Sequence, residues 1–205
     1  MHLVCSPFRF GNMVKGLSDK HKKAIEHCGL GGLLHLNPVT LRRMILIKLA
    51  KRLDYKNQRF HICGQNIPMT SQDVLKIMDL PIQGLDVFSW TKTKPNINLI
   101  IAYGSGNRIW TTDLLQILTE SKDKEPDDDF IRVFVLFAIG VLLAPTTKDY
   151  VDSKYLSVVE DASNIAKFNW GQFTLTHLLS SIHNFNHGEQ VNLQGNLTLL
   201  QVSLT

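Results

Sequence analysis

Residues 52–87 read RLDYKNQRFHICGQNIPMTSQDVLKIMDLPIQGLDV and contain the strongest local structural signals in the chain. A short alternating run at residues 59–62 is followed by Gly64, and a second short run covers residues 66–69. Glycine readily adopts the positive φ that a tight turn between two strands needs. The pattern therefore predicts one small β-hairpin near residues 59–69, with Phe60 and Ile62 facing inward.

A helix is predicted directly after this hairpin. Thr70 stands three residues before Asp73, which is the spacing of a capping box at a helix start. The apolar residues that follow have helical spacing: Val74, Leu75, Ile77 and Met78. Proline cannot continue a helix, so Pro81 is expected to end this one.

Three blocks of the chain together resemble a known family. They are Phe60 with Asp73 and Leu80–Gly84, then Phe137–Gly140 with Pro145–Val151 and Lys154–Leu156, and finally Asn164–Trp170. In order and spacing they resemble the plant mobile domain, also described as aminotransferase-like, which occurs in plant transposable elements and in host proteins derived from them. They are similarly close to its sister domain, which lies upstream of SUMO-protease-like domains in plant transposon proteins. The resemblance covers roughly residues 10–200.

This resemblance implies a plant domain of transposon origin that acts in the nucleus. We expect residues 1–205 to form a single domain that is shortened at its C-terminus, because similar proteins run on past this point. The aminotransferase-like label is treated as a name only. A pyridoxal-phosphate enzyme needs a Schiff-base lysine, a phosphate cup and a residue facing the pyridine nitrogen, and no such set is recognisable.

The composition is that of a globular protein with one core. The chain has 205 residues, of which 44% are hydrophobic and 20% are charged. Its helical periodicity predicts a mainly α, multi-helix domain. Three cysteines, Cys5, Cys28 and Cys63, form no metal-binding spacing and favour a reducing compartment over a disulfide framework.

The charge of the chain is unevenly distributed. Residues 1–60 contain 12 Lys and Arg against 3 Asp and Glu, whereas residues 61–205 contain 10 against 15. A helix is predicted over residues 41–53, with an apolar face formed by Leu41, Ile45, Leu49 and Leu53. Lys48, Lys51 and Arg52 share another face and are the candidate contact for phosphate or an acidic partner. Alternatively, these three residues form an ordinary solvated helix face. The excess positive charge of residues 1–60 could also simply be neutralised by the acidic residues of 61–205 within one fold.

Further helices are predicted along the chain. The apolar run 130–143 is expected to be the central buried helix, and it is too short to span a membrane. Residues 150–160 and 168–185 are also expected to be helical, with His177 as a hydrogen-bonded core residue. Residues 96–103 fit a helix or a strand, and residues 83–95 a loop. Asp127, Asp128 and Asp129 suggest either a metal site or favourable contact with a helix N-terminus, and the latter explains them better.

No catalytic residue, metal ligand or cofactor site is predicted. His27 and Cys28 are adjacent, and neighbouring side chains on a helix point apart. The predicted function is therefore a non-catalytic interaction module with a protein partner and weak, non-specific nucleic-acid contact. The alternatives are an accessory domain that positions a protease or transposase from another chain, or an organelle-acting protein that uses its basic N-terminus. The predicted location is the nucleus, with cytoplasm or mitochondrion as alternatives.

Overall fold

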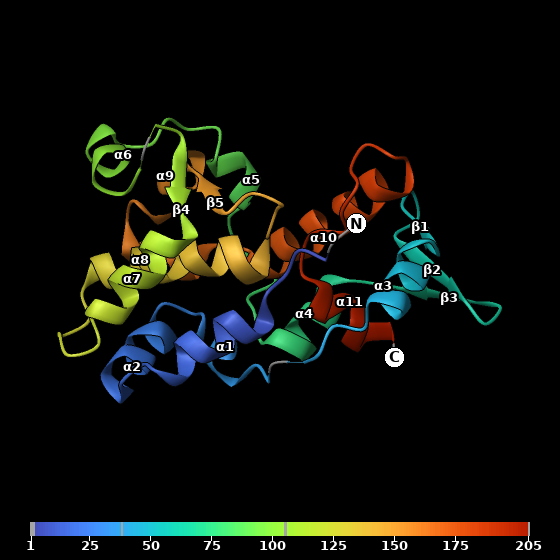
Figure 1. Cartoon of the computed structure of the whole chain (residues 1–205), viewed down its shortest axis with the longest axis horizontal. Helices are drawn as coiled ribbons and strands as arrows, with labels where there is room; N and C mark the ends of the chain where they lie inside the picture. Colours follow the sequence, from blue (N-terminus) through green and yellow to red (C-terminus); the bar gives the residue numbers. More distant parts are fainter. Residues whose placement is uncertain (1–2, 38, 105, 205) are drawn as a thin grey trace.

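The computed structural model describes residues 3–37, 39–104 and 106–204. Helices account for 57% of the chain, which confirms the predicted mainly α domain. Figure 1 shows an elongated molecule with the three-stranded sheet β1–β3 toward one end and the two-stranded sheet β4–β5 toward the other. None of the helices among the described residues is long and apolar enough to cross a membrane.

The elements alternate between short helices and very short strands. The α-helices are α1 (Pro7–Lys15), α2 (Asp19–His27), α3 (Arg43–Ala50), α4 (Ser71–Met78), α5 (Val87–Trp90), α6 (Ile97–Tyr103), α7 (Thr111–Glu120), α8 (Asp128–Ala138), α9 (Leu156–Val159), α10 (Trp170–Asn186) and α11 (Leu197–Leu204). The strands are β1 (Leu53–Asp54), β2 (Arg59–Ile62), β3 (Gln65–Pro68), β4 (Arg108–Trp110) and β5 (Tyr150–Asp152). The 3₁₀ helices are η1 (Gly31–His35), η3 (Ser153–Tyr155) and η4 (Ala162–Lys167), and η2 (Ile139–Leu143) is a π-helix.

The predicted hairpin is present as β2 and β3. Cys63 and Gly64 connect the strands with φ values of 48° and 76°, the two positive values of a type I′ turn. Phe60 is fully buried, as predicted, whereas Ile62 is only partly buried. The sequence did not predict β1, which pairs with β2 through Leu53 opposite Phe60.

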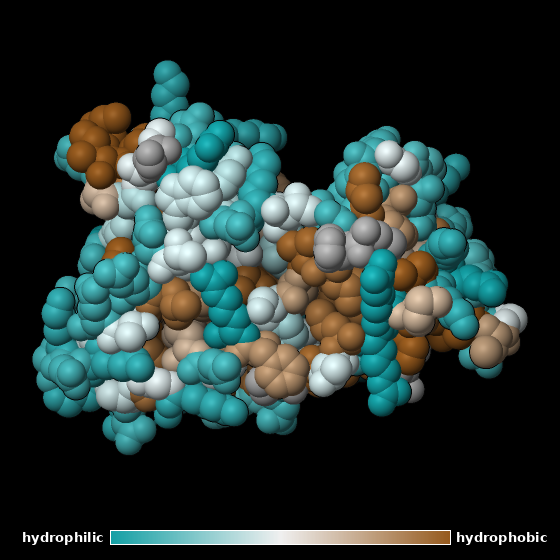
Figure 2. Space-filling view, viewed as in Figure 1, coloured by the Kyte–Doolittle hydropathy of each residue, from teal (hydrophilic) through white to brown (hydrophobic). Residues whose placement is uncertain are grey.

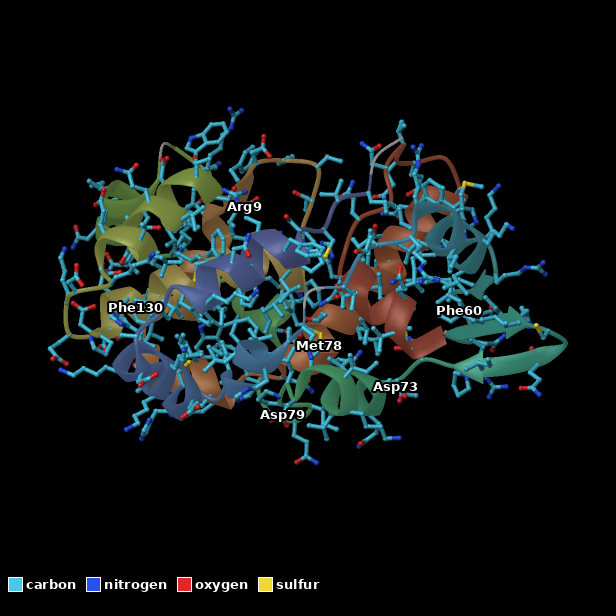
Figure 3. The ribbon with its side chains drawn as sticks, turned by 60° about the horizontal axis from the view of Figure 1, so that its bottom comes forward. Arg9, Phe60, Asp73, Met78, Asp79 and Phe130 are labelled. Carbon is cyan, nitrogen blue, oxygen red and sulfur yellow. The ribbon has the colours of Figure 1, made fainter. Side chains whose placement is uncertain are left out.

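Helix α4 begins as the capping-box pattern predicted. The Asp73 carboxylate accepts the backbone N–H of Thr70 at 2.8 Å and the Thr70 hydroxyl at 2.9 Å. The helix ends at Met78, because Asp79 adopts the left-handed conformation with φ of 50° before Pro81 is reached. Figure 3 labels Asp73, Met78 and Asp79 along this helix.

The centre of the core is α8, as predicted from the apolar run 130–143. Every residue from Val133 to Ala138 is buried, and Phe134 is packed between Phe10 and Phe130. The predicted helix changes type within the run, because Ile139–Leu143 continue it as a π-helix. The Asp127 carboxylate caps α8 by accepting the Phe130 N–H at 2.8 Å.

The acidic residues 127–129 interact with groups of the helix that they begin, α8. Besides the Asp127 cap, Asp128 and Asp129 each lie 3.8 Å from a guanidinium nitrogen of Arg132. These contacts agree with the helix-terminus interpretation of the run. Within the described ranges, no group of three or more His, Cys, Asp or Glu side chains is placed to hold a metal ion.

Two sequence predictions between residues 83 and 160 are wrong, and one choice that the sequence left open, between helix and strand at residues 96–103, is decided for the helix. Residues 150–160 are not one helix, because residues 150–152 form β5 and pair with β4, a sheet that the sequence did not predict. The predicted loop 83–95 contains α5, whose Val87 is fully buried. Residues 97–103 are helical, as α6, and Figure 2 shows an apolar cluster over this helix.

Two segments that are far apart in the sequence join through their backbones. The Leu85 N–H donates to the Lys167 carbonyl at 2.8 Å, and the Gly171 N–H donates to the Pro81 carbonyl at 2.8 Å. Gly84 lies so close that a β-carbon there would be 2.1 Å from the Lys167 carbonyl oxygen. We call these contacts between residues 81–85 and 167–171 the backbone junction. The same residues belong to two of the sequence blocks that carry the family resemblance.

The C-terminal segment packs within the chain. Leu197, Leu199 and Leu200 of α11 are fully buried, and this helix contacts α3 and α4. The Asn196 side chain caps α11 by accepting the Leu199 N–H at 3.0 Å. The apolar run at the end of the sequence is therefore explained by the core of this domain.

We expect Thr70→Ala to lower the free energy of unfolding by about 1 kcal/mol, because the N-cap residue of α4 loses its hydroxyl contact with Asp73. Thr70→Ser keeps the hydroxyl and is the matched control, expected to remain near the parent. Urea unfolding followed by circular dichroism measures both variants. Equal stability of the alanine variant and the parent would contradict a capping role.

We expect Gly84→Ala to lower the free energy of unfolding by roughly 2 kcal/mol or more, because the new methyl group would collide with the Lys167 carbonyl while φ is 119°. Gly188→Ala is the control, because Gly188 also has a positive φ, 76°, but open space where a β-carbon would lie. Thermal unfolding of the two variants separates the collision from the backbone strain. Similar losses in both would show that the close approach at Gly84 is unimportant.

Candidate functional site

Helix α3 is shorter than predicted, so that Lys48 lies within it and Lys51 and Arg52 follow its end. It covers Arg43–Ala50 in place of residues 41–53, because the chain leaves the helix to enter β1. Of the predicted apolar face, only Leu49 is buried, and Leu41, Ile45 and Leu53 are partly buried. Leu46 and Ala50, which the four-residue repeat did not include, are fully buried.

A groove lies between the C-terminal end of α3 and the hairpin. Its volume is about 560 Å³, and it is open to solvent. The α3 side is formed by Lys48, Leu49 and Arg52. The hairpin side is formed by His61, Ile62, Cys63, Gly64 and Asn66. We call this the α3–hairpin groove.

The groove exists because β1 is so short. The backbone N–H of His61 donates to the Arg52 carbonyl at 3.0 Å, and this is the last contact between the two segments. Beyond it, the chain on the β1 side belongs to α3, so β2 has no strand on that side at Ile62, where its neighbour is β3 alone. An edge of β2 and the end of α3 therefore face each other across open space.

The groove lies in the most basic part of the molecule. Residues 42–61 contain the basic side chains Arg42, Arg43, Lys48, Lys51, Arg52, Lys56 and Arg59, against the single acid Asp54. Lys48, Lys51 and Arg52 are exposed, and within the described part of the chain none of them has an ion pair. The Asp54 carboxylate accepts a hydrogen bond from the Asn57 side-chain amide at 2.7 Å, and it lies 4.0 Å from Nε2 of His61.

The three predicted contact residues are not equivalent in space. Lys48 and Arg52 line the α3–hairpin groove, whereas Lys51 lies outside its lining. The predicted set of three cations therefore contains two residues that line the groove and one, Lys51, that lies beside it. That these residues contact phosphate or an acidic partner stays a prediction. A structural role is also available, because cations at the C-terminal end of a helix interact favourably with its dipole.

A second cavity lies near the β4–β5 sheet and includes His177. The ring of His177 is partly buried, and its Nδ1 atom is shielded from solvent without a hydrogen-bond partner. The sequence-based interpretation of His177 as a hydrogen-bonded core residue is therefore wrong about the hydrogen bond. Burial of the ring, and then the positive charge of Lys154, lower the pKa of His177 to about 4.

Comparison with known proteins places the chain in a family. It belongs to the family defined by the domain of unknown function DUF8566, whose model matches residues 3–201. It is similar to Protein MAIN-LIKE 2, Protein MAIN-LIKE 1 and Protein MAINTENANCE OF MERISTEMS of Arabidopsis thaliana, with 24% identity to each over 90% of this chain. These relatives connect the chain, at a coarse level, with the plant mobile domain proteins.

The relatives are much longer than this chain. The alignments cover 30%, 40% and 41% of their lengths, so the chain spans between about a third and two fifths of the relatives it matches. No solved structure matches the chain. The matched region therefore corresponds to one part of each relative.

The sequence analysis identified one side of the α3–hairpin groove but not the other. His61 and Asn66 on the hairpin were interpreted only as strand residues, because a hairpin pattern does not show which helix lies beside it. Lys148 and Lys154, which line the second cavity, were noted only as parts of a family block. Their position at the same cavity as His177 follows from tertiary packing and not from any sequence spacing.

We expect His177 to make stability depend on pH below neutrality. Its folded pKa is about 4 against an ordinary value of 6.5, so between these values the unfolded chain binds more protons. The contribution is therefore fully present above about pH 6.5 and is lost as the pH falls toward 4. The loss should approach about 3 kcal/mol, on the scale of ~1.4 kcal/mol per pKa unit.

The comparison of parent and His177→Gln isolates this effect, because glutamine does not titrate. The other titratable groups lining the same cavity are retained in both proteins: Lys148, Tyr150, Asp152, Lys154 and Tyr155. Urea unfolding from pH 7 to pH 4 should show a steeper loss in the parent. Parallel curves for the two proteins would mean that His177 titrates like a free imidazole.

Proposed function

We propose that this domain is a non-catalytic interaction module that holds an acidic segment of a partner protein in the α3–hairpin groove. The observation that carries the proposal is the pair of exposed cations, Lys48 and Arg52, at a groove with no acidic residue among its described lining residues. An arginine presents several N–H donors in a fixed plane that matches a carboxylate. Basic groups without internal partners remain available for an external one.

The apolar part of the groove favours a peptide over nucleic acid. Leu49 and Ile62 line the same groove as the cations, where they can contact apolar side chains of a partner. On the side of β2 that faces away from β3, no strand pairs with Ile62, so an extended chain could lie there. A partner segment with carboxylates and at least one apolar side chain would use all three features.

Weak and non-specific nucleic-acid contact is the second candidate function. The observation that favours it is the density of positive charge in residues 42–61, seven Lys and Arg against one Asp. Contacts of this kind go to phosphate groups and carry little sequence information. They would weaken steeply as the salt concentration rises.

The family resemblance supports further parts of the proposal. We propose a transposon origin, with the sister domain next to SUMO-protease-like domains as the related form, and action in the nucleus. An accessory domain that positions a protease or transposase, or an organelle-acting protein with a basic N-terminus, are the alternatives. Microscopy of the tagged full chain in plant cells separates nuclear from mitochondrial or cytoplasmic action, and co-purification of a protease would favour the accessory role.

The groove is tested with a short fluorescent peptide rich in Glu, Asp and Leu. Binding to the parent should be measurable by fluorescence anisotropy at low salt. Lys48→Glu with Arg52→Glu should weaken it by about tenfold or more, which corresponds to ~1.4 kcal/mol. Lys51→Glu is the control, because it reverses a charge at the end of the same helix but outside the groove lining, and it should have a smaller effect.

The same proteins are then mixed with duplex DNA across a salt series. Loss of DNA binding in the double variant, with a salt slope reduced by about 2, would assign the cations to phosphate contacts. An equal loss of peptide binding in Lys51→Glu would contradict the groove and indicate general electrostatic attraction. No binding of peptide or DNA by the parent at low salt would overturn both candidate functions.

A further inference from the structure

The second cavity is a site that the proposed function does not use. Its volume is about 260 Å³, and it lies between α10, the π-helix η2 and the β5–η3 segment. This is slightly below the roughly 300–1,000 Å³ of pockets for drug-sized ligands, so it suits a smaller molecule. A π-helix in one wall is also notable, because such turns occur often at functional sites.

One side of the cavity is apolar. Phe88, Ile139, Ala144 and Val151 line it, and of these Ile139, Ala144 and Val151 are buried. They come from α5, η2 and β5, which tertiary packing alone brings together. A ligand that occupied this space would remove apolar surface from water, which favours binding by a hydrocarbon or aromatic body.

Two exposed lysines, Lys148 and Lys154, also line the cavity. The ammonium group of Lys148 lies 5.3 Å from the centre of the Tyr150 ring, and that of Lys154 lies 5.3 Å from the centre of the Tyr155 ring. Neither lysine has an ion pair with a carboxylate within the described ranges. Cations held over aromatic faces keep their charge and are partly preorganised.

The acid at this cavity is Asp152, and it is already engaged. Its carboxylate accepts the backbone N–H of Lys154 at 2.9 Å, as the N-cap of η3. With Lys148 and Lys154 positive, Asp152 negative and His177 neutral, the charged groups of the lining leave an excess of one positive charge. The cavity therefore favours a ligand with a single negative charge.

His177 supplies a directional contact. Its Nδ1 is closed off beside Gly195, where a β-carbon would lie 3.5 Å away, so Nε2 is the nitrogen that the cavity can reach. A neutral imidazole carries one proton, and a buried donor without a partner costs more than an acceptor without one. The proton is therefore favoured on Nε2, which makes His177 a hydrogen-bond donor toward the cavity.

We propose that this cavity binds a small organic carboxylate with an apolar body, with Lys148, Lys154 and His177 contacting the carboxylate and Phe88, Ile139 and Val151 contacting the body. Three donors and several apolar side chains in one lining select for this chemistry over a neutral apolar molecule or a fully hydrated anion. The site is separate from the α3–hairpin groove, and the two share no lining residue.

The test uses sodium benzoate as the probe, with benzyl alcohol as its uncharged counterpart and inorganic phosphate as an anion without an apolar body. Binding to the full chain is followed by the NMR signals of the His177 ring, assigned with His177→Gln. Benzoate should shift these signals in a saturable manner. Benzyl alcohol and phosphate should bind about tenfold more weakly, or not detectably, because each lacks one half of the contacts.

Variants then assign the contacts. Lys148→Gln combined with Lys154→Gln should weaken benzoate binding by about tenfold or more while the melting temperature stays near that of the parent, since both side chains are exposed. Lys76→Gln, an exposed lysine of α4 outside the cavity lining, is the control and should bind like the parent.

The proposal is overturned if benzoate leaves the His177 signals unchanged, if benzyl alcohol or phosphate binds as tightly as benzoate, or if Lys76→Gln weakens binding as much as the double variant. Lys48→Glu with Arg52→Glu should leave benzoate binding unaltered. The two proposals are therefore tested by separate variants, and the carboxylate site can fail while the α3–hairpin groove stands, or the reverse.

Discussion

The backbone junction between residues 81–85 and 167–171 is the contact on which the arrangement of the domain depends. Backbone N–H and C=O groups that leave water must find partners, and here they find each other. The Asn169 side chain adds a hydrogen bond to the Ile82 carbonyl at 2.8 Å and also caps α10 through the Gln172 N–H. The junction thus sets where α10 begins relative to the end of α4, and Gly84 is the residue that permits the approach.

Helix α10, whose start is fixed by the backbone junction, contacts both candidate sites. His177, in its first half, lines the second cavity. Near its end, the Asn186 side chain donates to the Ala50 carbonyl at the end of α3 at 2.8 Å, and His183 stacks on Tyr55 with ring centres 4.3 Å apart. A single helix therefore supports the α3 end of the α3–hairpin groove and one wall of the second cavity, although the two sites lie in different parts of the molecule.

The two sites differ in how their charges are held. At the α3–hairpin groove, Lys48 and Arg52 project into solvent, where screening by salt limits each contact to a small free energy. At the second cavity, lysines lie over aromatic rings beside a shielded imidazole, so a bound charge would lose less to solvent. The groove is suited to weak and reversible contact with a large partner, and the smaller cavity to a small ligand that stays partly open to solvent.

Local sequence patterns determined the hairpin, the capped start of α4, the central helix α8 and the positive charge around α3. Each of these depends on interactions between residues close in the chain, such as Thr70 with Asp73 or the turn at Cys63 and Gly64. Tertiary structure alone decided the pairing of β4 with β5, the division of Lys48, Lys51 and Arg52 between groove and neighbouring surface, and the missing hydrogen-bond partner of His177. The physical reason is that a β-sheet pairing and a cavity wall are made by segments tens of residues apart, and neither periodicity nor composition specifies which distant segments meet.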